Sequence, residues 1–255
     1  MRPFDDLIAE ALAADVDGWG FAWLEGRATE ERPPWGYARL LAARVAAARA
    51  PLDLDTGGGE VLDEAPVIPS GALATEGWPA NLGLARARLE PRGVRVLRHA
   101  TGTRLPVADA SRDLVTARHP VAPDFGEIAR VLAPGGTYLA QHVGPWSAAE
   151  LSERFLGPLP GNPVARDPGA EVLAAQAAGL EVVDLRAARL RQEYRDVGAI
   201  VWILRKCPWW VPGFDADVRR GRHDATLRAL DAELRASVPF VAHASRHLMR
   251  LRKPA

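Results

Sequence analysis

Three consecutive glycines follow a short apolar segment that also carries two aspartates. Residues 52–62 read LDLDTGGGEVL, and Glu76 lies 23 residues after Asp53. Glycines let the backbone approach a ligand closely and adopt positive φ angles. A helix that begins after them offers unpaired N–H groups to an anion, and an acid such as Glu76 can accept hydrogen bonds from both hydroxyls of a ribose. Many folds bind a nucleotide where a strand end runs into glycines and a helix start, although the glycines alone do not identify a ligand. For Glu76 the alternative is an acid at the start of the helix that begins near Pro79.

Histidines supply a second kind of chemistry. Arg118 and His119 follow an apolar segment, and an imidazole there can act as a base near neutral pH or orient a substrate. A structural hydrogen bond within the loop is the alternative. We expect His142 to be buried and structural. His243 and His247 would suit a metal ion only on a helix, because on a strand they lie about 13 Å apart. We therefore predict no metal site.

Aromatic side chains gather in two segments, residues 15–37 and 197–214. Ligands of open parallel sheets bind at the C-terminal ends of the strands. We expect the aromatic side chains to form an apolar cap over a substrate there, with simple packing against the core as the alternative for at least half of them. They are Trp19, Phe21, Trp23, Trp35, Tyr37, Trp202, Trp209 and Trp210.

The elements that position these residues alternate between strand and helix over residues 51–146. We predict strands at 51–55, within 67–75 and at 93–99, 113–119 and 137–144, with helices after the glycines, at 79–89 and at 125–136, the last one stopped by glycines. Such alternation is typical of a parallel sheet that helices cover on both faces. Elsewhere we predict helices at 3–14, 35–50, 170–180, early in 197–214 and at 217–234, and strands within 181–194 and at a sheet edge in 240–254.

Four pieces in this order carry a family resemblance. They are Asp53 to Gly59, Glu76, the segment from Leu105-Pro106 to Asp113-Leu114-Val115, and Val131 to Gly136. About residues 37–146 resemble the class I, Rossmann-like methyltransferases that use S-adenosylmethionine. The resemblance implies an α/β fold with a doubly wound, mostly parallel seven-stranded sheet whose last strand is antiparallel. We place an N-terminal helical and aromatic cap at 1–48 and the methyltransferase domain at 49–255, with a cap insertion at about 195–236.

The resemblance also implies S-adenosylmethionine as the cofactor, and it assigns the predicted site residues. The cofactor-binding residues are Asp53, Asp55, Thr56, Gly57, Gly58, Gly59, Glu76, Gly77, Trp78 and Thr101. Trp78 is expected on the adenine face, with core packing as the alternative. The substrate residues are Trp19, Trp23, Trp35, Tyr37, Arg118 and His119. His119 is the catalytic candidate, although a base is needed only if the nucleophile must lose a proton.

Two positions depart from the family pattern. Asp55 replaces its first glycine, where the carboxylate either crowds the methionine end of the cofactor or pairs with its ammonium group. The family often has an acid after the third strand to bind the adenine amino group, but residues 99–103 read HATGT. Either Thr101 or the backbone substitutes for that acid, or adenine is held less specifically.

Composition limits the remaining choices. The 255 residues include one cysteine, Cys207, and the N-terminus lacks the basic start and apolar run of a signal peptide. No apolar run is long enough to span a bilayer, so we predict a cytoplasmic protein without membrane association. The net charge is zero, but residues 186–255 hold 15 basic and 7 acidic residues, a balance of +8.

Three functions follow from these features. The first is methyl transfer to a small or medium-sized organic acceptor, which the aromatic side chains favour. The second is methylation of RNA, because the basic C-terminal third would attract an anionic partner. The third is a non-catalytic member of the fold, which the two departures from the family pattern would explain. The sequence does not predict an oligomeric state.

Overall fold

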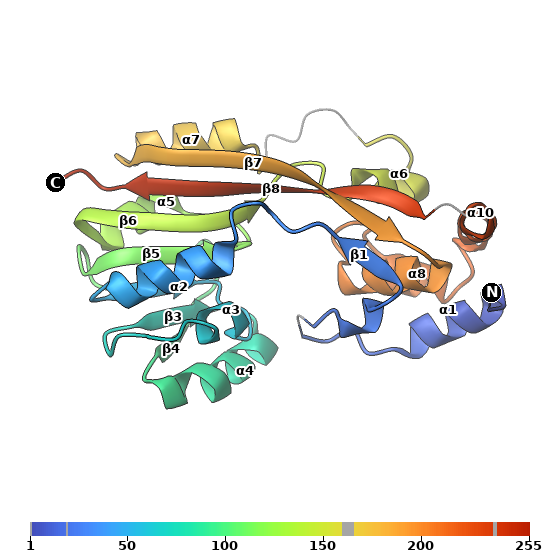
Figure 1. The fold of residues 1–255 in the computed structure, drawn as a ribbon, viewed down its shortest axis with the longest axis horizontal. Helices are drawn as coiled ribbons and strands as arrows, with labels where there is room; N and C mark the ends of the chain where they lie inside the picture. Colours follow the sequence, from blue (N-terminus) through green and yellow to red (C-terminus); the bar gives the residue numbers. More distant parts are fainter. Residues whose placement is uncertain (1, 19, 160–165, 237–238) are drawn as a thin grey trace. The chain divides into compact units, whose positions relative to one another are not determined.

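The computed structural model describes residues 2–18, 20–159, 166–236 and 239–255 (Figure 1). The chain divides into two compact units that interleave along the sequence. Unit 1 comprises residues 1–32, 146–163 and 189–245, and unit 2 comprises residues 33–145, 164–188 and 246–255. Among the described residues no helix is both long and apolar enough to cross a membrane.

One sheet of eight strands runs in the order β1-β7-β8-β6-β5-β2-β3-β4. The strands are β1 (Ala28–Glu30), β2 (Pro51–Leu54), β3 (Leu73–Glu76), β4 (Arg95–Arg98), β5 (Arg112–Arg118), β6 (Leu132–Val143), β7 (Glu181–Tyr194) and β8 (Phe240–Arg252). Strands β2 to β6 pair in parallel, β8 is antiparallel to β6, and β1 is antiparallel to β7.

The strand count and the place of β8 differ from the sequence prediction. Seven strands were predicted, and β1 adds an eighth from a segment that we assigned to the cap. The final strand is antiparallel as predicted, but it lies between β7 and β6 instead of at an edge. Its alternating basic residues suggested an exposed edge, yet Leu248, Met249 and Leu251 are buried between neighbouring elements.

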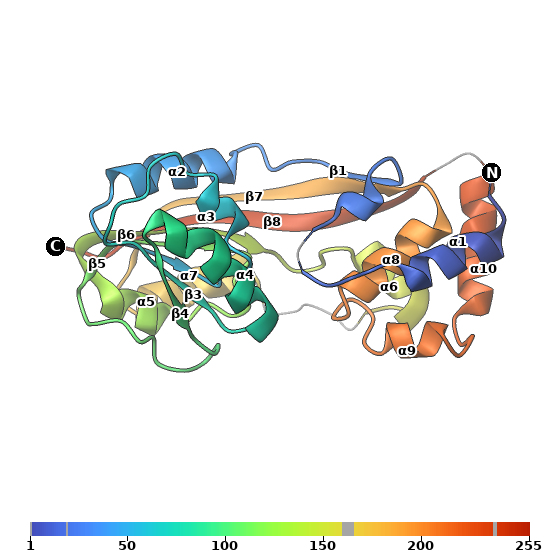
Figure 2. The ribbon, with the colours of Figure 1, turned by 90° about the horizontal axis from the view of Figure 1, so that it is seen from below.

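Helices cover both faces of the sheet in unit 2. They are α2 (Tyr37–Ala47), α3 (Glu60–Asp63), α4 (Pro79–Leu89), α5 (Phe125–Val131) and α7 (Pro168–Ala177). Neighbouring residues of a strand point to opposite faces. Leu114 and Leu139 accordingly pack in one cluster with α2, α3 and α4, whereas Val115 and Tyr138 pack in another with α5 and α7. Figure 2 shows α2 and α5 on opposite sides of β5 and β6, which confirms the doubly wound arrangement.

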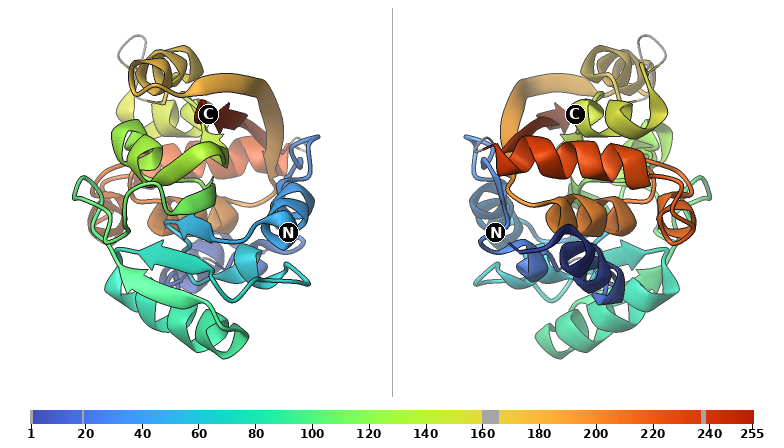
Figure 3. Two further views of the ribbon diagram at one scale, coloured as in Figure 1. Left: turned by 90° about the vertical axis from the view of Figure 1, so that its left-hand side faces the viewer. Right: turned by 90° about the vertical axis from the view of Figure 1, so that its right-hand side faces the viewer.

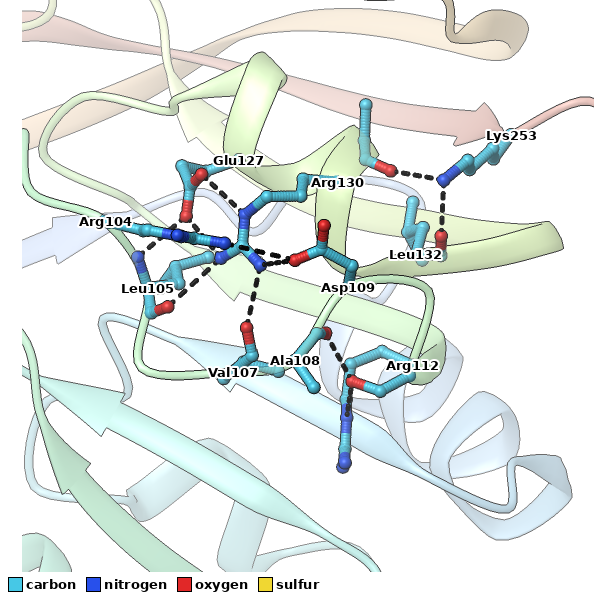
Figure 4. A network of polar contacts seen from close by, with 12 residues as sticks. Arg104, Leu105, Val107, Ala108, Asp109, Arg112, Glu127, Arg130, Leu132 and Lys253 are labelled. Atoms are coloured by element: carbon cyan, nitrogen blue, oxygen red, sulfur yellow. Dashed lines mark hydrogen bonds and ion pairs between the residues drawn. The ribbon is translucent and has the colours of Figure 1, made fainter.

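The helix α5 ends earlier than predicted. It was expected to run to the glycines at 135 and 136, but it stops at Val131, and β6 begins at Leu132. The Lys253 ammonium group donates to the carbonyl of Ala129 at 2.8 Å and to that of Leu132 at 2.7 Å (Figure 4). This lysine satisfies C-terminal carbonyls of the helix, a task that glycine motifs often perform.

The LP…DLV segment is fixed by two side chains. Arg130 of α5 donates to the carbonyls of Leu105 at 3.1 Å and Val107 at 2.8 Å, and it pairs with Asp109 (Figure 4). The Asp113 carboxylate accepts from the backbone N–H groups of residues 49 and 50 at 2.7 and 2.9 Å. Asp113 therefore anchors the start of β2.

Unit 1 is mainly helical. Its helices are α1 (Phe4–Ala13), α6 (Ala149–Leu156), α8 (Val197–Lys206), α9 (Phe214–Val218) and α10 (Asp224–Arg235), with short 3₁₀ turns at Ala22–Leu24 and, in unit 2, at Glu90–Arg92. Nearly all of α8 is buried, and Leu227, Leu230 and Leu234 of α10 pack in the same cluster. The right-hand view of Figure 3 shows α10 beside α8. The single predicted helix at 217–234 is thus two helices.

The two units have boundaries different from those of the predicted cap and domain. Residues 33–48, assigned to the cap from sequence, cluster with unit 2 because Tyr37, Leu41 and Val45 of α2 are buried against its sheet. Residues 146–163 and 189–245 join unit 1, which extends the predicted insertion on both sides.

Candidate functional site

The site lies where the strand order reverses. From β2 the chain proceeds outward to β3 and β4, and it then returns to β5 on the other side of β2. Open α/β sheets bind ligands outside the carboxyl ends of the strands at such a point. A pocket in unit 2 opens between the loops that follow β2, β4 and β5. Its lining includes Leu54, Asp55, Thr101, Thr103, Pro120, Ala122 and Tyr138.

The glycine loop connects β2 with the four-residue helix α3. Gly57 and Gly59 have φ angles of +65° and +82°, which side chains rarely adopt. At Gly59 a Cβ atom would also lie 2.8 Å from the side chain of Leu89 on α4. Thr56 N–H donates to the carbonyl of Thr75 at 2.9 Å, so the loop is tied to β3. The glycines thus have the conformational role that the sequence predicted.

Asp55 has a φ angle of +50°, in the left-handed region that glycine favours. The position therefore keeps the conformation expected of the glycine that it replaces, and aspartate is among the residues that tolerate it best. Its Oδ2 accepts from the Val121 N–H at 3.2 Å. The side chain consequently links the loops that follow β2 and β5, across the switch point.

Asp53 is buried between two strands. It is the register partner of Thr116 on β5, whose hydroxyl donates to its Oδ1 at 2.6 Å. Burial raises the pKa of Asp53 to about 6, against the opposing effect of that hydrogen bond. The geometry gives Asp53 a role in holding β2 to β5 beneath the loop.

Glu76, at the end of β3, holds the loop with both carboxylate oxygens. Oε2 accepts from the Gly57 N–H at 2.8 Å, and Oε1 accepts from the Trp78 N–H at 2.7 Å. Burial raises its pKa. Each oxygen keeps a further lone pair, so the carboxylate can still accept from ribose hydroxyls. At Gly77 a Cβ atom would lie 2.6 Å from the carbonyl oxygen of His99, which explains the glycine.

The adenine candidates lie at the surface. Trp78 precedes α4 and is 68% exposed, so it does not pack in the core. Thr101 lies in the exposed turn after β4, in the pocket lining. Gly58, by contrast, is buried within the turn of the glycine loop and has no positive φ angle. A hydroxyl group is therefore available in the pocket lining after β4, and an exposed aromatic side chain follows β3.

His119 is the end of a hydrogen-bonded chain that sequence reasoning missed. The indole N–H of Trp35 donates to Gln141 Oε1 at 2.7 Å, and Gln141 Nε2 lies 2.9 Å from His119 Nε2. An indole N–H can only donate, so the amide oxygen faces Trp35 and the amide NH₂ faces the imidazole. His119 Nε2 must then accept, which places the ring proton on Nδ1.

The same surroundings keep His119 neutral. Burial lowers its pKa well below the ordinary value, and the positive charges of Arg246 and Arg118 add to this effect. The residue also has a φ angle of +57°. The ring therefore offers an N–H donor from Nδ1, while its only lone pair is engaged by Gln141. Gln141 lies on β6, the partner strand of β5, and belongs to no motif, so only the strand register reveals its contact with His119.

The other predicted substrate residues belong to different parts of the structure. Tyr37 is buried and donates its hydroxyl to the carbonyl of Ala117 at 2.8 Å, as a core residue does. Trp23 belongs to unit 1, where it stacks on Trp202 with ring centroids 5.5 Å apart. Arg118 is exposed at the end of β5. Trp19 lies outside the described residues.

Comparison with known proteins agrees with this geometry. Residues 52–140 match the family model described as a methyltransferase domain. A Bacillus halodurans protein proposed to be a methyltransferase is 19% identical, with 86% of this chain and 99% of that chain covered and a TM-score of 0.58.

Two further solved structures share the fold. The YcgJ protein from Bacillus subtilis is 18% identical, with 86% of this chain and 98% of that chain covered and a TM-score of 0.59. The [4+2]-cyclase SpnF is 19% identical, with 86% and 80% covered and a TM-score of 0.51. No curated protein matches the chain. Residues 52–140 therefore carry the methyltransferase domain signature, within a chain that has the class I methyltransferase fold.

Proposed function

We propose that the protein is an S-adenosylmethionine-dependent methyltransferase that acts on a small or medium-sized organic acceptor. The observation that supports this most is the pocket at the β2–β5 switch point. Asp55 borders it on one side and Thr101 on another, and Glu76 supports the glycine loop that follows Asp55. These residues fit the cofactor in order, from its methionine end at Asp55 to its adenine end near Trp78.

The cofactor supplies an activated methyl group, and methyl transfer requires the acceptor atom to be aligned with it. The side chain best placed for alignment is His119, whose Nδ1–H can donate to an oxygen of the acceptor. In this tautomer the neutral ring is no base, because Gln141 occupies its lone pair. We therefore assign His119 to acceptor binding, and we favour acceptors that carry an oxygen beside the methylated atom.

RNA is less well supported as the acceptor. Four acidic residues from outside the basic segment 186–255 form ion pairs with it: Asp5, Glu150, Glu181 and Asp184. Within the described part of the segment, at least nine of its 15 basic residues form ion pairs. They are Arg186, Arg189, Arg191, Arg205, Arg219, Arg222, Arg228, Arg235 and Arg252. The four outside partners thus offset half of the +8 balance, whereas Arg27 and Arg154 from outside the segment pair with its Asp196 and Glu233.

Calorimetric titration with S-adenosylmethionine tests the proposal. We expect saturable binding of one cofactor per chain. The substitution Gly59→Val forces a β-branched side chain into a left-handed position against Leu89, so it should abolish binding. Gly93→Ala, also at a positive φ but in open space after α4, is the control for general strain. Absence of wild-type binding at millimolar ligand would refute the enzyme and favour the non-catalytic alternative.

A further inference from the structure

A buried cluster in unit 2 joins two histidines and a glutamate from three elements. His142 on β6 and His247 on β8 are direct register partners, and their ring centroids lie 4.9 Å apart. Glu171 of α7 places Oε2 at 2.7 Å from His142 Nδ1 and at 2.6 Å from His247 Nε2. The two histidines are 2% and 1% exposed, and Glu171 is 9% exposed.

The two imidazoles point at a common position. A ring nitrogen binds a metal ion along the direction in which it otherwise donates or accepts a hydrogen bond, and both rings direct that nitrogen toward Glu171 Oε2. The three ligand atoms lie within 4.8 Å of one another. Ligands of a tetrahedral zinc ion, each about 2.0–2.1 Å from it, are about 3.3 Å apart. The carboxylate therefore has to withdraw by less than about 1 Å to admit an ion.

The outer nitrogens of both rings allow the tautomers that a metal requires. His142 Nε2 lies 2.9 Å from the Tyr138 hydroxyl, which can accept its proton when Nδ1 binds a metal. Glu171 Oε2 now accepts the proton of His247 Nε2, whereas His247 Nδ1 has no hydrogen-bond partner within the described part of the chain. When an ion replaces the proton on Nε2, Nδ1 can therefore carry the ring proton without losing an existing contact. Both inner nitrogens can thus present lone pairs to the same ion.

We propose that His142, Glu171 and His247 bind a divalent transition-metal ion of the Zn²⁺ type. Two imidazole nitrogens and one carboxylate oxygen suit Zn²⁺, whereas Mg²⁺ and Ca²⁺ prefer oxygen ligands alone. A water molecule completes the tetrahedron. The ion ties α7 to β6 and β8, so its role is to stabilise that side of the sheet. This site is independent of the proposed methyl transfer.

Metal titration of the chelator-stripped protein tests the proposal. We expect one Co²⁺ per chain with the visible absorption of a tetrahedral site, and displacement of Co²⁺ by Zn²⁺ measured against a chromogenic chelator. His247→Ala and Glu171→Gln should each weaken Zn²⁺ binding at least hundredfold. His243→Ala is the matched control, because it removes a histidine that also contacts a glutamate, Glu150 at 2.7 Å. It should leave the affinity unchanged.

Melting experiments on the wild-type protein test metal binding without any variant that could fail to fold. Zn²⁺ that binds the native state raises the melting temperature of the wild-type protein, whereas Mg²⁺ should not. The proposal is overturned if the wild-type protein binds no stoichiometric Co²⁺ or Zn²⁺. It is also overturned if a folded Glu171→Gln protein binds Zn²⁺ as tightly as the wild type, since the cluster would then be a hydrogen-bonded part of the core only.

Discussion

Asp55 is the residue on which the cofactor site depends most directly. Its carboxylate lies in the pocket lining beside the glycine loop, where the proposed cofactor places its methionine ammonium group. The substitution Asp55→Asn keeps the size and the tolerance of left-handed φ but removes the charge. We expect it to weaken binding of S-adenosylmethionine about tenfold or more. Calorimetry on both proteins measures the difference.

The matched ligand for this prediction is methylthioadenosine, which lacks the amino-acid part of the cofactor. Its affinity should be the same for the wild type and for Asp55→Asn. If the variant binds S-adenosylmethionine as tightly as the wild type or more tightly, Asp55 crowds the cofactor instead of pairing with it.

His119 gives a prediction that needs no acceptor. Long-range ¹H–¹⁵N NMR of the imidazole should show the proton on Nδ1, because Trp35 fixes Gln141 and Gln141 occupies Nε2. In Trp35→Phe the amide can turn over, so both tautomers should appear. Trp78→Phe, at an exposed tryptophan, should leave the spectrum of His119 unchanged. A wild-type ring protonated on Nε2 would contradict the assignment.

Asp53 predicts a pH dependence of stability. Its pKa is about 6 in the folded protein and lies at the ordinary value of 3.8 in the unfolded chain. Between these values the native state binds more protons, so the free energy of unfolding falls as the pH rises from about 4 to about 6, by roughly 3 kcal/mol. Asp53→Asn should be more stable than the wild type above pH 6 and should lack this slope. Urea denaturation across the range tests it, and an unchanged slope would exclude Asp53 as its source.

Among the elements, α5 shows how a distant residue fixes a helix end. Lys253→Met removes both hydrogen bonds that the ammonium group donates to the carbonyls of Ala129 and Leu132. We expect a loss of about 1–3 kcal/mol in the free energy of unfolding. Arg252→Met is the control, because the ion pair of Arg252 with Glu181 is exposed and should contribute less than about 1 kcal/mol. Equal losses in the two variants would argue against the capping role.

The alternation of strands and helices was predictable because each element carries its own periodicity. Residues 79–89 were predicted as a helix and form α4 with the same bounds. The predicted end of α5 was wrong because the decisive lysine is more than 100 residues away along the chain. The position of β8 inside the sheet likewise depends on pairing with β6, which no local pattern records.

Site residues were predictable where the local backbone conformation determines their type. They were less predictable where strand register determines which side chains meet. The glycines have the predicted positive φ angles, and Glu76 holds their loop through the Gly57 N–H. Gln141 was missed, since it reaches His119 only through the pairing of β5 with β6. The juxtaposition of His142 and His247 was missed for the same reason, because the sequence separates them by more than 100 residues.

At the scale of the whole molecule, the balance of charge bears on the choice between acceptors. The chain has 32 basic and 32 acidic residues, and four acidic residues from outside the basic segment offset half of its excess charge. We expect the protein to elute from heparin at or below the physiological ionic strength of about 0.15 M. Retention beyond that, with an RNA affinity that falls steeply with salt, would favour the RNA acceptor.

The chain of hydrogen bonds from Trp35 to His119 has a consequence for measuring motion. The Trp35 indole is 8% exposed, and its N–H is engaged by Gln141 at 2.7 Å. Its proton can exchange with deuterium only when this contact opens. The exchange rate of that one proton therefore reports how often the hydrogen bond between Trp35 and Gln141 opens. Slower exchange in the presence of cofactor would show that cofactor binding also rigidifies the residues that hold His119.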